Sequence, residues 1–291
     1  TAAALIMIEP AARVAQLAAL SESVRVSAGG TELAWRRWPG PSGHPPLLLL
    51  HGGFGSWTHW IANLPGLMAE RETWTLDLPG LGDSGDLSPP FTTEHFADVV
   101  ASGLVELFGD STPYELAGFS FGAMIGAHVS LRTGKRCQRL SLVGAAGCGH
   151  LHHQVSLLPP PDHSLPTDEA AAIHRDNLQR LMIADPAAID DLAVHVHGDN
   201  LDRHRFRSRK LAGSDDLLRV LPDIPAPLVG IWGERDATAG DLSAIEERGK
   251  LFRAAQPDAE FHILKGIGHW AMYEAPDQVN RLLLGGSAHQ A

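Results

Sequence analysis

The chain alternates short apolar runs with longer stretches of helical periodicity. The pattern predicts strands at six places: Leu47–Leu50, Thr73–Leu76, Tyr114–Ala117, Leu140–Val143, Leu228–Trp232 and Glu260–Leu264. It predicts helices at Thr58–Ala69, Thr93–Phe108, Phe121–Arg132, Asp241–Ala255 and Pro276–Leu284. Strands that alternate with helices indicate parallel β-α-β units, and therefore an α/β fold with a mostly parallel central sheet and helices on both faces.

Two further segments precede this alternation. Val24–Ser27 and Glu32–Trp38 predict a β-hairpin around Gly29–Gly30. Residues 1–20 are expected to be an N-terminal extension with a short surface helix from Pro10 to Leu20. They lack the basic start of a secretion signal.

The alternation stops between residues 148 and 224. This segment opens with a loop rich in His and Pro, and helical patterns follow at Glu169–Ile183 and Pro186–His197. A basic run, Arg203–Lys210, comes next, and no strand pattern is present. The segment therefore predicts a helical insertion into the α/β domain, with Pro222, Pro225 and Pro227 marking the return to the sheet.

Composition excludes several classes of protein. The 291 residues carry 23 basic and 34 acidic side chains, a net charge of −11, which opposes binding to nucleic acid or to an anionic membrane surface. No apolar run approaches the roughly 20 residues that span a bilayer. The two cysteines, Cys137 and Cys148, exclude a disulfide scaffold and fit a reducing, cytoplasmic compartment. Oligomeric state is left open, with a homodimer as one possibility.

A Gly-x-Ser-x-Gly pentapeptide, Gly118–Gly122, lies between a predicted strand and a predicted helix. A turn this tight forces its central residue, Ser120, into a strained backbone conformation, and the flanking glycines leave room for close approach. The hydroxyl is then presented beside a helix N-terminus, which favours developing negative charge. Ser120 is therefore the candidate nucleophile. The alternative is a glycine turn with a helix-capping serine.

A second glycine-rich segment, His51–Gly55, follows the strand Leu47–Leu50. The tetrahedral intermediate of acyl transfer needs two backbone N–H donors for its oxyanion. We predict one donor from Phe121, the residue after the nucleophile, and the other from Gly53 or Phe54. His51 is interpreted as structural, holding this segment by hydrogen bonds.

An acid and a base follow the last two predicted strands. Asp236 lies in the turn Gly233–Asp236, where a carboxylate can orient a histidine and stabilise its charged form; Glu234 is the alternative. His269 lies in the glycine loop Gly266–Trp270 and is the predicted general base. These segments all follow strand ends, the edge at which open α/β sheets build their sites.

In the order of Ser120, Asp236 and His269, the sequence resembles the α/β-hydrolase fold superfamily over roughly residues 22–285. The turn Asp77–Ser84 is similar to the family's loop after its fourth strand. The resemblance implies the α/β-hydrolase fold, with a core in two parts, 21–147 and 225–291, and with residues 148–224 as the helical cap.

Within the superfamily, the chain resembles the meta-cleavage product hydrolases of aromatic degradation and related carboxylesterases. The segment Gly268–Ala271, with Asn280–Leu282 behind it, is similar to the ending of those carbon–carbon bond hydrolases. Their oxyanion segment has a proline that residues 52–55 lack, and Phe119 stands where they have Asn. These departures favour ester hydrolysis.

A further departure concerns the cap arginine with which those enzymes hold the carboxylate of a dienoate. Near the matching helix this chain has His195 and His197, and the candidate replacements are Arg175, Arg203 and Arg205. If the basic run faced the pocket, it would favour an anionic substrate.

The resemblance implies a serine hydrolase that needs no metal or organic cofactor and acts on a small aromatic or apolar ester through an acyl-enzyme. The expected substrate-binding residues are Phe119, Trp270, Met182 and His195. Alternatives are a carbon–carbon hydrolase acting on a 2-hydroxy-6-oxo-dienoate, a cofactor-free haloperoxidase or lyase, and a non-catalytic receptor on the same fold.

Eight of the sixteen histidines fall in the predicted cap. His150-x-His152-His153 and His195-x-His197 could in principle bind a metal, but no Cys or acidic residue has matching spacing. The favoured interpretation is therefore a solvated cap surface, with a carboxylate-binding or pH-sensitive pocket as the alternative.

Overall fold

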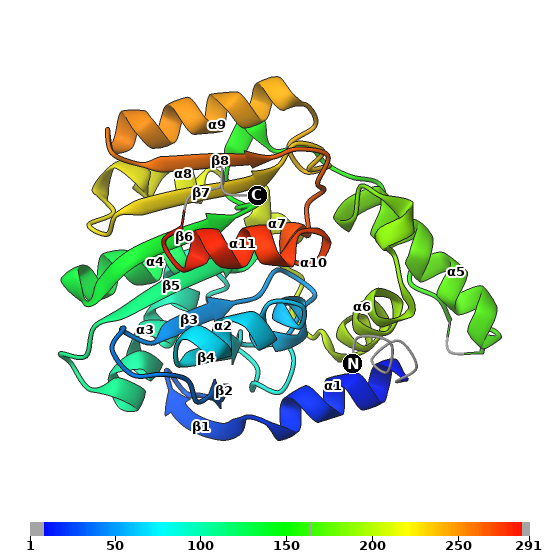
Figure 1. Cartoon of the computed structure of the whole chain (residues 1–291), viewed down its shortest axis with the longest axis horizontal. Coiled ribbons are helices and arrows are strands. Elements are labelled where there is room, and N and C mark those ends of the chain that lie inside the picture. Colours follow the sequence, from blue (N-terminus) through cyan, green and yellow to red (C-terminus); the bar gives the residue numbers. More distant parts are fainter. Residues whose placement is uncertain (1–8, 163, 287–291) are drawn as a thin grey trace.

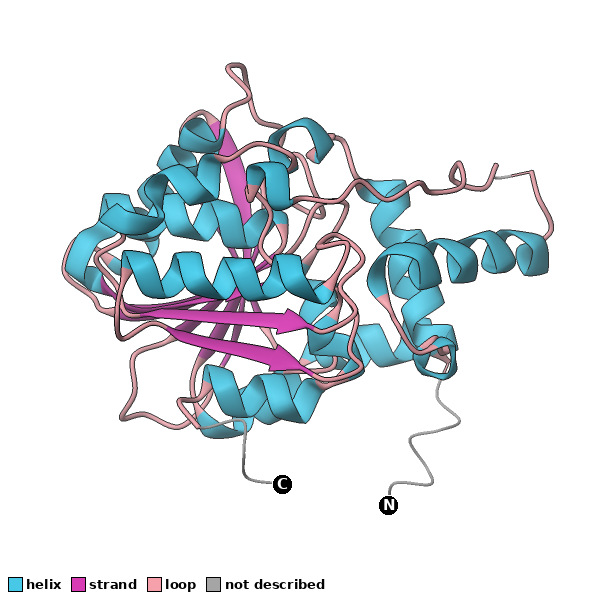
Figure 2. Ribbon diagram, turned by 90° about the horizontal axis from the view of Figure 1, so that it is seen from above, coloured by secondary structure: helices cyan, strands magenta, loops and turns pink. Residues whose placement is uncertain are grey.

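The computed structural model describes residues 9–162 and 164–286, in which an eight-stranded sheet lies between two layers of helices (Figures 1 and 2). The strands are β1 (Glu22–Ala28), β2 (Thr31–Trp38), β3 (Leu47–Leu50), β4 (Thr73–Asp77), β5 (Tyr114–Phe119), β6 (Cys137–Val143), β7 (Leu228–Gly233) and β8 (Glu260–Leu264). Their order is β1-β2-β4-β3-β5-β6-β7-β8. Strands β3 to β8 pair in parallel, and β2 pairs antiparallel with both β1 and β4. The predicted α/β-hydrolase fold is confirmed.

The central strands are apolar throughout because helices cover both faces of the sheet. Strand β3 consists of four buried leucines. Leu48 and Leu50 pack into the core on one face, and Leu47 and Leu49 pack into the core on the other. This alternation follows from the two-residue period of a strand.

Two groups of helices make the layers. One face is covered by α3 (Thr93–Phe108), α4 (Phe121–Thr133), α8 (Asp216–Val220) and α9 (Leu242–Ala255). The other is covered by α1 (Pro10–Ala19), α2 (Leu64–Glu70), α10 (Ala271–Glu274) and α11 (Pro276–Leu283). No helix within the described ranges is both long enough and apolar enough to cross a bilayer.

The prediction of one continuous helix over Thr58–Ala69 is wrong. The chain forms a short 3₁₀ helix, η2 (Trp57–Trp60), and α2 begins separately at Leu64. Pro65 lies in the first turn of α2, where its missing N–H costs nothing. Asn63 precedes α2 and donates from Nδ2 to Asn280 Oδ1 at 2.9 Å, which ties the break to α11.

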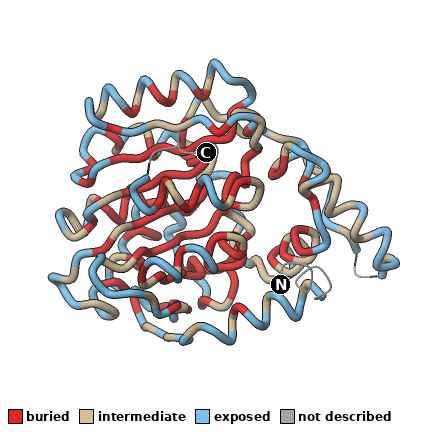
Figure 3. Tube along the Cα trace, viewed as in Figure 1, coloured by how far each residue is buried: buried red, intermediate tan, exposed pale blue. Residues whose placement is uncertain are grey.

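The insertion between β6 and β7 is helical, and no strand occurs in its described part. It contains η4 (Gly149–Leu151), α5 (Thr167–Asn177), η5 (a π-helical turn, Leu178–Met182), η6 (Pro186–Ala188), α6 (Asp191–Arg203), α7 (Arg209–Ala212), α8 and η7 (Leu221–Asp223). Helices α5 and α6 stand beside the sheet (Figure 1). Most of α5 is half-buried or exposed (Figure 3), and Asn177 is its one buried residue. The end of the insertion differs, because Leu217 and Leu221 pack into the core beneath α4.

Candidate active site

The turn between β5 and α4 holds Ser120 in a strained conformation. Its φ is 51° and its ψ is −112°, in the left-handed region that residues with a side chain rarely adopt. The flanking glycines are required by space: a Cβ on Gly118 would lie 2.5 Å from Ala123 Cα, and one on Gly122 would lie 2.3 Å from the His51 carbonyl oxygen. The side chain of Ser120 makes no capping hydrogen bond to α4, which argues against the alternative of a capping serine.

A buried acid–histidine pair lies at the ends of β7 and β8. His269 Nδ1 is 2.9 Å from Asp236 Oδ2, and the side chains are 4% and 0% exposed. The other carboxylate oxygen, Oδ1, accepts hydrogen bonds from the Thr238 N–H at 2.8 Å and the Thr238 hydroxyl at 2.7 Å. Burial alone would raise the pKa of Asp236, but the charge and hydrogen bond of His269 and the two bonds from Thr238 hold it below its ordinary value.

Glu234, the alternative acid, faces away from this pair. Its Oε2 accepts a hydrogen bond from the Gly266 N–H at 2.8 Å and so ties the turn after β7 to the loop after β8. The geometry therefore favours Asp236 as the carboxylate that orients His269.

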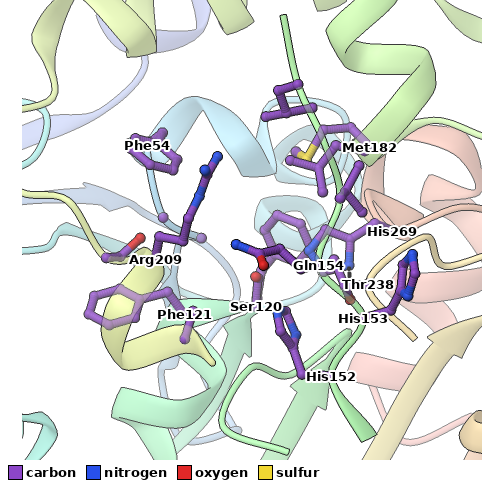
Figure 4. A pocket seen from close by; sticks show the side chains of 18 residues that line it. Phe54, Ser120, Phe121, His152, His153, Gln154, Met182, Arg209, Thr238 and His269 are labelled. Carbon is purple, nitrogen blue, oxygen red and sulfur yellow. Dashed lines mark hydrogen bonds between the residues drawn. The ribbon is translucent and has the colours of Figure 1, made fainter. Parts of the chain in front are cut away.

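Ser120 and His269 line one small cavity of about 100 Å³ (Figure 4). Its walls also include the predicted oxyanion residues Gly53, Phe54 and Phe121. The fold thus brings together segments from the ends of β3, β5 and β8. As the first residue of α4, Phe121 has no intrahelical acceptor for its N–H, which is available to a ligand.

Two buried histidines fix the oxyanion segment. The Leu78 N–H donates to His51 Nε2 at 2.9 Å, so the proton of His51 resides on Nδ1, which donates to the Gly52 carbonyl at 2.7 Å. The Gly52 N–H donates to His59 Nδ1 at 3.2 Å. Burial lowers the pKa of His51 to about 4 and that of His59 well below its ordinary value, so both rings are neutral. The structural interpretation of His51 agrees with this arrangement.

This hydrogen-bond pattern distinguishes Gly53 from Phe54 as the oxyanion donor. In a trans peptide the C=O and the following N–H point in opposite directions, so fixing the Gly52 carbonyl also fixes the direction of the Gly53 N–H. A Cβ on Gly53 would lie 3.8 Å from Phe121 Cβ, which places Gly53 beside the other donor. Phe54 instead has a φ of 55° and packs its ring against His204 at a centroid distance of 5.0 Å. The geometry favours Gly53.

Two of the four predicted substrate-binding residues line the cavity. Phe119 lies beneath the site with its ring centroid 4.9 Å from that of His269, and Met182 reaches the cavity from η5. Trp270 requires a correction: it is 1% exposed, donates from Nε1 to the His59 carbonyl at 2.8 Å and packs on Tyr273 within the core.

His195 also requires a correction, because it lines neither this cavity nor the larger one beside it. Residues two apart on a helix lie about 200° apart, so His195 and His197 point to nearly opposite sides of α6. It is His197 that lines the larger cavity.

Several cavity residues are not among the predicted catalytic or substrate-binding residues. They are His59, His152, His153, Gln154, Ser208, Arg209 and Thr238. Most come from irregular segments of the insertion, where no period indicates which side chains point inward. Within the described residues, no group of three or more His, Cys, Asp or Glu side chains is arranged to hold a metal ion.

Comparison with known proteins agrees with this geometry. The profile of the alpha/beta hydrolase fold family matches residues 45–190. The dihydrolipoyllysine-residue acetyltransferase component of an acetoin cleaving system from Pseudomonas putida is 31% identical, over 89% of this chain and 68% of that protein. A 2-hydroxy-6-oxononadienedioate/2-hydroxy-6-oxononatrienedioate hydrolase from Paraburkholderia phymatum is 26% identical, over 92% and 95%. Naproxen esterase (carboxylesterase NP) from Bacillus subtilis shares the fold, with a TM-score of 0.69 at 18% identity over 95% and 96%.

Proposed function

The chain belongs to the alpha/beta hydrolase fold family, and from this premise we propose that it is a serine hydrolase that cleaves carboxylic esters. The observation that carries the proposal is that His269, which is hydrogen-bonded to the buried Asp236, lines the same cavity as the strained Ser120. A strained backbone and a buried charge each lower stability, so their coincidence at one cavity supports a catalytic role.

The proposed reaction begins when Ser120 Oγ attacks the ester carbonyl carbon and its proton passes to His269 Nε2. Asp236 accepts the Nδ1–H of His269 and stabilises the imidazolium. The N–H groups of Phe121 and Gly53 bind the oxyanion. Collapse of the intermediate expels the alcohol, which takes the proton from Nε2. Water then repeats the sequence on the acyl-enzyme and releases the acid.

The lining of the site supports a small or apolar ester. Around the cavity beside Ser120, the side chains of Phe54, Phe119, Leu181 and Met182 are apolar. Apolar walls with a few polar groups at the reacting atoms are typical of sites that orient a small organic substrate.

Carbon–carbon cleavage of a 2-hydroxy-6-oxo-dienoate is the second candidate, favoured by the relative from Paraburkholderia phymatum. One feature opposes it: Phe119 occupies the position before the nucleophile with an apolar ring.

The deciding experiment measures kcat/KM on 4-nitrophenyl butanoate and on a 2-hydroxy-6-oxo-dienoate in parallel. We expect rapid ester cleavage, slow dienoate turnover and labelling of Ser120 by a fluorophosphonate probe. Ser120→Ala should abolish both labelling and turnover. A strong preference for the dienoate would replace the esterase proposal with the second candidate. Failure of a folded wild-type protein to react with the probe would favour a receptor.

A further inference from the structure

A second, larger cavity of about 500 Å³ adjoins the site. The two cavities share Gly53, Phe54, Leu157, Leu181, Met182 and Arg209, so they lie side by side against the same residues. No Asp or Glu occurs among the described residues that line either cavity. Since the whole chain has a net charge of −11, a cavity without acidic groups departs from the rest of the molecule.

The arginines around this space differ in what they contact. The three arginines expected to replace the cap arginine are all paired: Arg175 with Asp191, Arg203 with Asp83 and Arg205 with Asp86. The first pair lies within the insertion, the other two join it to the loop after β4, and each carboxylate already compensates the charge of its arginine.

Arg209 has no such partner. No carboxylate of the described residues lies within ion-pair distance of its guanidinium, and it lines both cavities. Figure 4 shows its side chain beside Phe54 and Phe121, on the oxyanion side of the site. Arg207, also without a carboxylate partner in the described part of the chain, lines the larger cavity alone.

Two of the three histidines that line the larger cavity supply no competing charge. His59 and His197 are neutral at physiological pH because burial lowers their pKa values, that of His197 to about 4. His204 is engaged with the Leu201 carbonyl through Nδ1. The permanent positive charge in this space belongs to Arg207 and Arg209, and of these two only Arg209 also lines the cavity that Ser120 and His269 line.

From this placement we propose that Arg209 binds a carboxylate on the substrate, so that the preferred ester is a monoanion with its apolar part in the larger cavity. The inference rests on the proposed esterase function and names its substrate class. A planar guanidinium fits one carboxylate with two parallel hydrogen bonds. The apolar walls, including Leu157, Leu158 and Leu201, fit the hydrocarbon between that carboxylate and the ester.

The test compares pairs of esters that differ in one carboxylate. The 4-nitrophenyl half-ester of hexanedioic acid is compared with 4-nitrophenyl hexanoate, which places the charge in the acyl half. Next, 4-(butanoyloxy)benzoate is compared with phenyl butanoate, which places it in the alcohol half. In at least one pair we expect the wild-type protein to prefer the anion, and Arg209→Gln to lower kcat/KM for that anion about tenfold, as for a charged hydrogen-bond pair partly open to solvent.

The neutral partner of each pair is the internal control, and its kcat/KM should change less than about twofold in Arg209→Gln. Lys210→Gln is the matched variant, because Lys210 is the next residue on α7, carries the same charge and lines neither cavity. Equal losses on anionic and neutral esters, or an equal loss in Lys210→Gln, would overturn the subsite while leaving the esterase function intact. A wild-type protein that prefers neither anion would also overturn the subsite without affecting the esterase proposal.

Two measurements separate the subsite from catalysis and from misfolding. Calorimetry with each of the two anionic esters should give, for at least one of them, a Kd about tenfold higher for Ser120→Ala/Arg209→Gln than for Ser120→Ala; equal Kd values for both esters would refute the subsite whatever the enzyme hydrolyses. In the wild-type protein, kcat/KM for the anionic ester should fall with added salt while that for its neutral partner stays level. A parallel salt dependence would also overturn the proposal.

Discussion

Because the oxyanion segment packs against the insertion, we expect Gly53→Ala to lower kcat. A Cβ at Gly53 would lie 2.1 Å from Ser208 Oγ and 3.2 Å from Ser208 Cβ. Gly53 does not have a positive φ, so alanine brings no backbone strain there, and any effect comes from this contact. Ser208 is buried, and even with its hydroxyl rotated away its Cβ stays 3.2 Å from the new methyl group, so the segment must shift by a few tenths of an ångström.

A shift of this size displaces one donor of the proposed oxyanion hole. The donor must lie about 2.7–3.1 Å from the oxyanion, and loss of one such donor lowers kcat by about 10²- to 10³-fold. We expect Gly53→Ala to show this loss on 4-nitrophenyl butanoate with a smaller change in KM, because the contact forms fully only in the transition state.

Substitutions of Ser208 should restore the activity of Gly53→Ala to different extents. Ser208→Ala removes the hydroxyl but keeps the Cβ at 3.2 Å, whereas Ser208→Gly removes both. In the Gly53→Ala background, Ser208→Gly should therefore restore kcat to within about fivefold of Ser208→Gly alone, and Ser208→Ala should restore less. Thermal unfolding of each variant checks that all are folded. The reasoning is refuted if Gly53→Ala keeps the wild-type kcat, or if the double variant with Ser208→Gly is as slow as Gly53→Ala.

Three further outcomes are expected. Ser120→Ala should lower kcat at least about thousandfold and leave the unfolding midpoint within a few degrees, since it deletes one hydroxyl; retained turnover would exclude it as nucleophile. Asp236→Asn should lower kcat about 10⁴-fold through the wrong tautomer of His269, whereas Glu234→Gln should cost little; the reverse result would reassign the acid. The pKa of His197 is about 4 when folded and about 6.5 when unfolded, so its contribution to stability is present above pH 6.5 and is lost as pH falls toward 4. Denaturant unfolding at several pH values should show a shallower loss in His197→Gln than in the wild-type protein, and equal slopes would contradict the assignment.

The sequence alone predicted those elements whose signal is local. Strand β3 begins and ends at the predicted residues, because a short apolar run between Pro46 and Gly52 leaves few alternatives, and β8 also has the predicted bounds. The positions of Ser120, Asp236 and His269 at strand ends could also be predicted, since each depends on a strand followed by a glycine-rich turn.

Predictions failed where an outcome depended on packing between distant segments. Trp270 follows the predicted base directly, yet its ring is buried against His59, which is 211 residues away along the chain. His195 and His197 are alike in sequence, and only the docking of α6 on the core decides which of them reaches the cavity. The basic run shows no sequence difference between its arginines, but Arg203 and Arg205 form ion pairs whereas Arg209 lines the cavity.

The sequence by itself therefore determined the α/β core, the identity of the candidate catalytic residues and the helical character of the insertion, because hydrophobic period and turn chemistry act over a few neighbouring residues. The tertiary structure alone decided the choice of Gly53 over Phe54, the pairing of most cap arginines and the exposure of Arg209 to the site. Those features arise where the oxyanion segment meets an irregular insertion more than 90 residues further along the chain, and no local pattern encodes the direction in which such side chains point.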